Sequence, residues 1–230
     1  MSSLSGLPYF IFKGQKSTDL GVVIKELPPI SKSQKNIDSI SIDGRNGNLH
    51  IDNGTYKTKN YSVKCILTDI SKIKSLKTLL DSTGKLELST EPNIEYNATV
   101  MNQIDFSKYL TYLKEFPVNF EVDPIGYSKT SKTNTYTASE NTFEVDGTVN
   151  VAPIITVTGT GTFTLNNKQV EVLETGIVID CLLMNCTKNN LNKNDKVVLD
   201  EFPELIVGEN TLNLGAGITS IQISYKEGWL

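Results

Sequence analysis

Alternation of apolar and polar residues dominates this chain and predicts a protein built mainly of β-strands. Every second side chain is apolar from Tyr61 to Leu67, and the run from Val118 to Val122 repeats the pattern. Side chains of a strand point alternately to its two faces, so each run indicates a strand with one buried face and one wet face. Shorter runs of the same kind lie at 40–42, 49–51 and 86–88.

One segment departs from the two-residue period and predicts a single amphipathic helix. Its apolar residues recur at spacings of three and four, which is the helical period. Thr68 or Asp69 is placed to accept hydrogen bonds from the first turn, and Gly84 is placed for a left-handed C-terminal cap. The lysines between the apolar positions form either a solvated face or a binding patch. The apolar positions are Ile70, Ile73, Leu76, Leu79 and Leu80, and the lysines are Lys72, Lys74 and Lys77.

Turn-forming dipeptides indicate a hairpin in the first half. Asp43-Gly44 and Asn46-Gly47 lie between two alternating runs and supply residues that tolerate positive φ. We therefore expect a hairpin whose tip is 43–47. Earlier apolar stretches at 9–12 and 20–24 predict a short hairpin or two strands.

A polar segment at 128–139 divides the chain. It holds almost no large apolar side chains, which predicts a linker between two domains. Beyond it, short strand-like runs are separated by turn signals and no helical pattern occurs, which favours a β-sandwich or barrel. Gly159 and Gly161 indicate a bend or bulge between two of these strands. We expect a first domain at 1–127, the linker at 128–139 and a second domain at 140–230.

Charge and hydropathy narrow the set of partners. The chain has 22 Lys plus Arg against 26 Asp plus Glu, a net charge of −4, and its lysines are scattered. This is unlike the clustered basic surface of a nucleic-acid binder. Apolar runs are only a few residues long, and no basic start followed by an apolar stretch opens the chain, so we expect neither a membrane span nor a secretory signal. Proteins are the expected partners.

Few residues offer catalytic or metal chemistry. The one histidine, His50, lies on a strand between apolar neighbours and so faces the opposite, wet side. Among the three cysteines, Cys65 points with an apolar set, while Cys181 and Cys186 are five apart and on one continuous strand would face opposite sides. No pair of carboxylates stands out by its spacing. We therefore expect no enzyme and no catalytic, cofactor-binding or metal-binding residues.

Several short motifs keep a fixed order along nearly the whole chain, and this order resembles the distal tail protein (Dit) family of long-tailed phages. Asp43 departs from the family pattern, in which a proline often opens that turn, and the short second half leaves no room for the insertions of some relatives. The motifs of the first half are Phe12-Lys13-Gly14, 17–22, 43–47, the helix and 116–120. Those of the second half are 146–148, 153–155, 159–161, 202–205, 208–210, 221–225 and Trp229-Leu230.

The resemblance implies a fold and a role. The fold is mainly β, with an N-terminal belt domain that carries one amphipathic helix and forms a hexameric ring, and a C-terminal galectin-like β-sandwich. The role is a structural hub in the virion, at the distal end of the phage tail, assembled in the bacterial host cytoplasm. The implied partners are further copies of the chain, the tail tube protein, a tail-associated fibre or lysin hub protein and receptor-binding parts.

Two other functions stay open from the residues alone. A sandwich domain also suits a carbohydrate-binding module of a surface or tail adhesion protein. Sugar binding by galectins, however, depends on a His, Asn and Arg cluster with a stacking Trp, and this second half has no His or Arg, with Trp229 next to the chain end. A wall-degrading enzyme acting through carboxylates is the third alternative.

Overall fold

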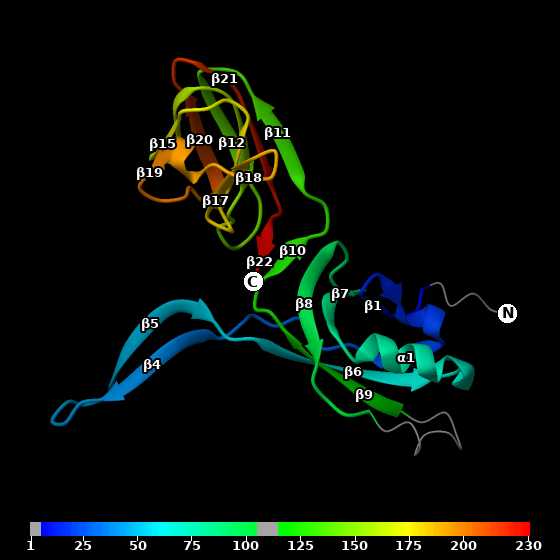
Figure 1. Cartoon of the computed structure of the whole chain (residues 1–230). Helices are drawn as coiled ribbons and strands as arrows, with labels where there is room; N and C mark the ends of the chain where they lie inside the picture. The colour runs from blue at the N-terminus through cyan, green and yellow to red at the C-terminus, as the bar shows by residue number, and fades with distance from the viewer. Residues whose placement is uncertain (1–5, 105–114) are drawn as a thin grey trace. The chain divides into compact units, whose positions relative to one another are not determined.

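The computed structural model describes residues 6–104 and 115–230, and the chain divides into two compact units. Unit 1 comprises Met1–Gly126 with Leu230, and unit 2 comprises Tyr127–Trp229. Both consist of antiparallel strands, and α1 is the only α-helix in the described ranges (Figure 1). The prediction of a mainly β protein with one amphipathic helix is confirmed.

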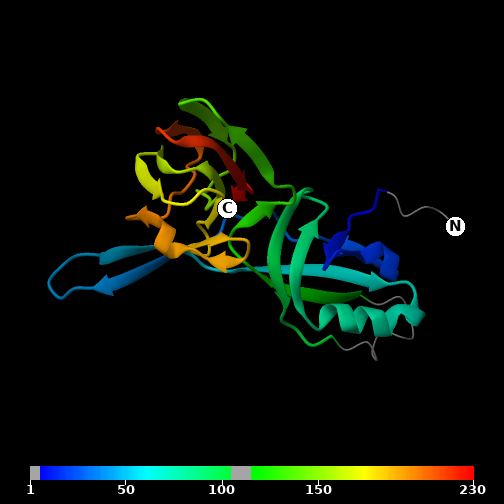
Figure 2. The same ribbon diagram turned by 45° about the horizontal axis from the view of Figure 1, so that its top comes forward.

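Unit 1 is built around an antiparallel sheet in the order β2-β1-β7-β8-β9-β6-β3. The helix α1 lies along this sheet (Figures 1 and 2). The strands are β1 (Phe10–Phe12), β2 (Gln15–Lys16), β3 (Val22–Glu26), β4 (Lys35–Ser41), β5 (Asn48–Tyr56), β6 (Lys59–Leu67), β7 (Thr83–Leu88), β8 (Ile94–Val100) and β9 (Glu115–Val122). The helical segments are the 3-10 turns Ser17–Leu20 and Ile70–Lys72 and the helix α1 (Ile73–Leu80).

The core of unit 1 follows from the alternation in β6 and β9. These strands pair along their whole length, which places Val63 opposite Val118 and Tyr61 opposite Phe120. Phe120 also meets the rings of Phe10 and Phe12 edge-on, with centroids 5.7 and 5.3 Å apart. Such aromatic contacts add to the free energy gained by burying the rings.

The helical segment opens with a 3-10 turn and ends earlier than expected. Asp69 accepts a hydrogen bond from the Ser71 backbone N–H at 3.0 Å and so caps the 3-10 turn Ile70–Lys72, whereas α1 itself begins after Lys72 without a side-chain cap. Leu76, Leu79 and Leu80 are buried in the core. The expected glycine cap is wrong: the helix ends at Leu80, and Gly84 lies in β7, paired with Ala98.

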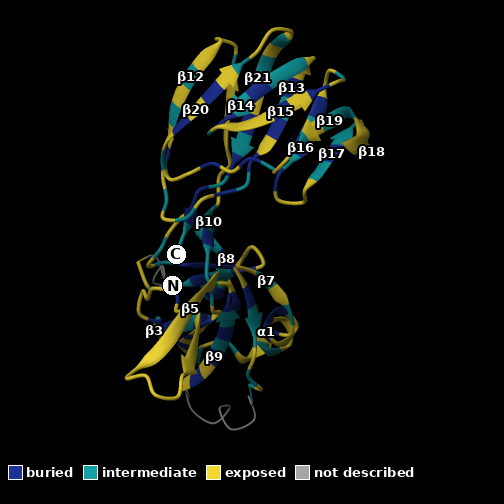
Figure 3. Ribbon diagram, turned by 90° about the vertical axis from the view of Figure 1, so that its left-hand side faces the viewer, coloured by how far each residue is buried: buried dark blue, intermediate teal, exposed yellow. Residues whose placement is uncertain are grey.

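The strands β4 and β5 form a two-stranded sheet of their own. This hairpin extends away from the main sheet of unit 1 (Figures 1 and 2), and its side chains are exposed along nearly its whole length (Figure 3). Its tip is 42–47, where Arg45 N–H donates to the Ile42 carbonyl at 3.1 Å. The predicted hairpin is confirmed.

Unit 2 is a β-sandwich of two antiparallel sheets, β11-β21-β13-β16-β17-β18 and β12-β20-β14-β15-β19. Its core contains apolar residues from both sheets, including Ile155 and Ile223 from one and Phe163 and Leu212 from the other. The strands are β11 (Lys132–Tyr136), β12 (Glu140–Val145), β13 (Ile154–Gly159), β14 (Gly161–Leu165), β15 (Lys168–Val172), β16 (Ile177–Asp180), β17 (Asn185–Lys188), β18 (Leu191–Asn192), β19 (Val197–Leu199), β20 (Gly208–Leu214) and β21 (Ile218–Tyr225). The short strands β10 (Gly126–Ser128) and β22 (Gly228–Trp229) pair with each other, and Asn194–Lys196 forms a 3-10 turn.

The segment 128–139, expected to be a linker, contains the edge strand β11. Lys132 to Tyr136 pair with β21, from Tyr225 to Ile221. The first four of these side chains are exposed, while Tyr136 stacks on Phe143 with centroids 5.0 Å apart. Polar composition misled the prediction because an edge strand is held by backbone hydrogen bonds and needs few apolar side chains.

The glycines at 159 and 161 perform the role predicted for them. The pairing of β13 with β21 shifts register between Thr158 and Gly159, as in a β-bulge. Gly159 has φ 104°, and a Cβ there would lie 2.2 Å from the Gly217 carbonyl oxygen. Only glycine fits so close to another backbone.

Lys59 is a nearly buried charged residue of unit 1, with only 7% of its surface exposed. Its Nζ lies 4.7 Å from the ring centroid of Tyr96 and 5.6 Å from that of Tyr61. Burial lowers the pKa of this amine below the ordinary value of 10.5, and the charge of Glu91 offsets part of that effect. The two ring faces attract the ammonium and reduce the cost of burying it.

Lys59→Met should remove a pH dependence of stability. Because the folded-state pKa is depressed, the buried charge destabilises the fold at low pH, and that cost fades as pH rises toward the unfolded pKa. The free energy of unfolding of the natural chain should therefore rise relative to that of Lys59→Met between neutral pH and the ordinary lysine pKa of 10.5 in urea titrations. Lys64→Met, on the exposed face of the same strand, is the matched control. An unchanged difference between the natural chain and Lys59→Met across this range would contradict the assignment.

Candidate interaction surfaces

Reactive side chains do not gather at any one place in the described ranges. No three His, Cys, Asp or Glu side chains there are grouped as they are around a metal ion. No helix within residues 6–104 and 115–230 combines the length and apolarity needed to cross a membrane. His50 pairs with Ser39 on the polar face of the β4–β5 hairpin and is exposed, as expected.

The cysteines occupy the cores of their units. Cys65 faces inward on β6, and burial raises the pKa of its thiol to about 12. Cys181 and Cys186 lie on either side of the turn between β16 and β17, and both contribute to the core of unit 2. A turn separates them, so the condition of one continuous strand is not met, and both are free, buried cysteines without a disulfide between them. Burial raises the pKa of both thiols, that of Cys181 to about 12.

One face of the β4–β5 hairpin is apolar and uncovered. Directly opposed residues of an antiparallel pair share a face, and the register places Ile40 opposite Leu49 and Asp38 opposite Ile51. Ile42 continues that face toward the tip. These aliphatic side chains are between 36% and 46% exposed, although residues of this type are usually buried. The surface formed by Ile40, Ile42, Leu49 and Ile51 is called the hairpin face below.

The opposite side of the hairpin is mostly polar and ties the two strands together. Asn48 Nδ2 donates to Ser39 Oγ at 2.8 Å, and Lys35 Nζ forms an ion pair with Asp52 Oδ2 at 2.5 Å. Ile37, opposite Asp52, is the apolar exception on this side. The hairpin is therefore amphipathic with both sides in water. Two-stranded ribbons are marginally stable alone, so such a ribbon gains from a surface that covers its apolar side.

Unit 2 carries an exposed apolar turn between β16 and β17. Leu182, Leu183 and Met184 are each 69% to 73% exposed. Asp180 Oδ1 accepts hydrogen bonds from the backbone N–H groups of Leu182 and Leu183 at 3.0 and 2.9 Å, and Met184 has a φ of 51°. The Asp180 carboxylate stabilises the backbone of the turn, while the apolar side chains of the turn are exposed to solvent. No sequence pattern signalled this exposure, because the turn reads as a continuation of the apolar strand before it.

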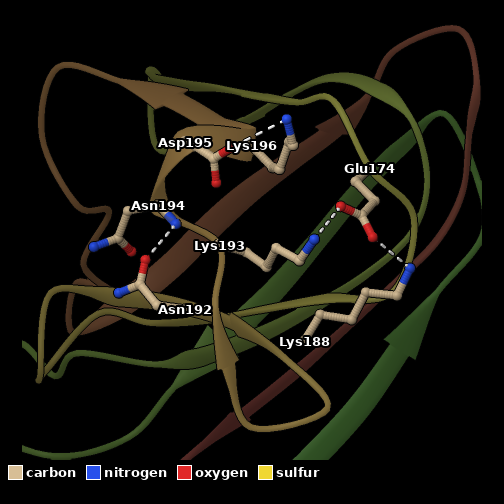
Figure 4. Close-up of polar contacts among 7 residues, drawn as sticks. All are labelled: Glu174, Lys188, Asn192, Lys193, Asn194, Asp195 and Lys196. Carbon is tan, nitrogen blue, oxygen red and sulfur yellow. Dashed lines mark hydrogen bonds and ion pairs between the residues drawn. The ribbon is translucent and has the colours of Figure 1, made fainter.

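An ion cluster joins three segments of unit 2 (Figure 4). Glu174 accepts from Lys188 Nζ at 2.8 Å and from Lys193 Nζ at 2.9 Å, with each side chain roughly three-tenths exposed. The two hydrogen bonds lower the pKa of Glu174 to about 2. Nearby, Asn194 Oδ1 accepts from the Cys186 backbone N–H at 2.7 Å. These contacts tie the β15–β16 turn to the segment around β17 and β18.

Comparison with known proteins identifies the fold. No protein-family model matches the chain, and no curated protein sequence matches it. Among solved structures, the fold is similar to that of a Dit protein. The matching structure is the crystal structure of SPP1 Dit (gp 19.1), described as a paradigm of the hub adsorption apparatus in phages that infect Gram-positive bacteria. It matches with a TM-score of 0.78 at 16% identity, over 97% of this chain and 100% of that one, which confirms the resemblance at the level of fold.

Glu174→Gln should destabilise unit 2 because it leaves two lysine ammonium groups close together without the carboxylate between them. Calorimetry at neutral pH should show a larger drop in the unfolding temperature than for Glu201→Gln, which breaks one exposed ion pair with Lys168.

The same substitution carries a pH signature. A depressed folded-state pKa gives stability that is present above the ordinary value of 4.5 and is lost as pH falls toward about 2. The difference between the natural chain and Glu174→Gln should therefore shrink over that interval. A difference that is independent of pH, or equal losses in Glu174→Gln and Glu201→Gln, would contradict the cluster's role.

Proposed function

We propose that this chain is a structural hub of a phage tail tip, a distal tail protein that joins the tail tube to the adsorption apparatus. The observation that carries the proposal is the likeness in fold to SPP1 Dit, which spans nearly the whole of both chains. A match of both units together is more specific than a match of one sandwich, because sandwich folds serve many functions. The order of motifs along the sequence supports the same assignment.

In this proposal unit 1 is the belt that closes into a ring of six subunits. A ring forms when one surface of each subunit meets a different surface of its neighbour at a rotation that closes. The hairpin face supplies a reason to associate, since it is apolar and extends beyond the rest of unit 1. Unit 2, proposed to be galectin-like, has a complete core of its own.

The size of the hairpin face limits what it can do alone. Covering four half-exposed aliphatic side chains contributes roughly 1 kcal/mol each, about 4 kcal/mol in all. Association costs about 4 to 15 kcal/mol in lost freedom of motion, so this face gives no tight dimer by itself. Closure of the ring and the adjoining tail proteins would add the remaining contacts. The proposed adjoining proteins are the tube protein on one side and a fibre or lysin hub protein with receptor-binding parts on the other, in the virion after assembly in the host cytoplasm.

Charged substitutions on the hairpin face should prevent ring formation. Ile40→Lys and Leu49→Lys place an ammonium group where the proposed interface excludes water. The matched controls, Ser39→Lys and His50→Lys, add the same charge one register position away, on the polar side of the hairpin. Native mass spectrometry and negative-stain images should show rings for the natural chain and the polar-side variants and monomers for the other two. Circular dichroism checks that all remain folded. Rings in all variants, or in none including the natural chain, would contradict the proposal.

Separate expression of the two units tests where the ring-forming surface lies. Residues 1–126 should form concentration-dependent oligomers, and residues 127–230 should be folded and monomeric. The second fragment must begin at 127 because β11 completes the edge of a sheet through its pairing with β21. Light scattering on each fragment measures the outcome. If the first fragment were monomeric and the second oligomeric, the ring-forming surface would lie in unit 2, and its assignment to unit 1 would be wrong.

A further inference from the structure

The β4–β5 hairpin contains both Asn-Gly dipeptides of the chain, Asn46-Gly47 at the tip and Asn53-Gly54 within β5. In such a pair the backbone nitrogen of the glycine can attack the side-chain carboxamide of the asparagine. Glycine favours this approach because it has no Cβ to obstruct it. Asparagine in exposed, loosely held segments is a thermolabile residue. The two sites share the same Asn-Gly pair and differ in their flanking residues, Arg45 and Asn48 at one and Asp52 and Thr55 at the other, so the folded chain must be compared with the unfolded one to isolate the effect of the fold.

The fold treats the two sites differently. Both glycines have a positive φ, 81° for Gly47 and 68° for Gly54, with open space around the Cα, but only Gly47 lies outside the strands. Within the ranges that the structure describes, neither the Asn46 side chain nor the Gly47 backbone N–H has a hydrogen-bond partner. The second site is held at both reacting groups. Asn53 Nδ2 donates to Asp38 Oδ2 at 3.0 Å, and Gly54 N–H donates to Asp52 Oδ1 at 3.0 Å.

We propose that Asn46 is a site of spontaneous deamidation in this protein and that Asn53, seven residues away, is protected by the hairpin. The Gly47 nitrogen forms a bond to Cγ of Asn46, and the carboxamide nitrogen leaves as ammonia after taking up the proton from Gly47. The product is a cyclic imide. Water then opens the ring at either carbonyl, which yields aspartate or isoaspartate at position 46.

The protection of Asn53 has a physical cause. Its carboxamide must rotate away from Asp38, and the Gly54 N–H must leave Asp52, before the nitrogen can reach Cγ. Asn53 lies within β5 at a register shift of the ladder, between the paired residues Asp52 and Tyr56, so the backbone rotation needed for ring closure would disturb the pairing on either side. At Asn46 none of these contacts has to be given up. The rate at the tip should exceed that at Asn53 by at least about tenfold.

The test uses the full chain incubated at neutral pH and sampled over time. Trypsin cuts after Arg45 and Lys57, so both sites fall in the peptide 46–57 and each acts as the internal reference for the other. Mass spectrometry with fragmentation locates the conversion of amide to acid, and isoaspartyl methyltransferase labelling identifies the isoaspartate. Conversion at Asn46 with little at Asn53 is expected. Asn46→Gln should remove the conversion at position 46 and leave the slower conversion at Asn53 unchanged.

Denatured protein supplies the decisive comparison. In urea, or in a synthetic peptide of residues 46–57, the two rates should approach each other because the hairpin contacts are gone. Equal rates in the folded chain, a faster rate at Asn53, or no conversion at Asn46 in the folded chain while the peptide reacts would each overturn the proposal.

One consequence rests on the proposed ring. Deamidation adds a negative charge, and the isoaspartate form also lengthens the backbone beside the hairpin face. Aged subunits should therefore assemble less well than fresh ones in native mass measurements. Aged chains that assemble normally would refute this consequence but would leave the proposed deamidation at Asn46 intact. Fresh chains that form no ring would instead count against the proposed function.

Discussion

The pairing of β6 with β9 is the constraint on which unit 1 depends. Their register sets Tyr61, Val63 and Cys65 on the inner side and leaves the lysine and serine side chains between them outside. Only Lys57 and Thr58 separate the end of β5 from the start of β6. The core thus fixes the point and direction from which the hairpin leaves the sheet. An arm rooted in a buried strand presents the same face in every copy of the chain, which a flexible loop would not.

Much of the fold could be predicted from the sequence because alternation directly reports which side chains are buried. The run at 118–122 and the three-and-four spacing from Ile73 to Leu80 became β9 and α1. The misses share one cause. The strand β11 and the strand residue Gly84 are held by backbone hydrogen bonds to neighbours that are distant in sequence, and such bonds leave no trace in local hydropathy.

Alternation in the sequence predicts the candidate surfaces only in part. Ile40, Ile42, Leu49 and Ile51 were identified as strand residues, yet alternation predicts a buried side and this side is exposed. Whether an apolar face is covered depends on what else the chain brings to it, and that requires the structure. The exposed turn at 182–184 was harder still, because its orientation depends on two hydrogen bonds to Asp180.

The buried cysteines give the chain a covalent structure that does not depend on its redox history. A thiolate is the species that reacts with disulfides and oxidants, and burial with a raised pKa keeps all three sulfurs protonated and out of contact with reagents. A chain moving from a reducing to an oxidising medium would therefore gain no disulfide to another chain through these residues. Any assembly it forms is then held by noncovalent contacts alone and stays reversible under both conditions.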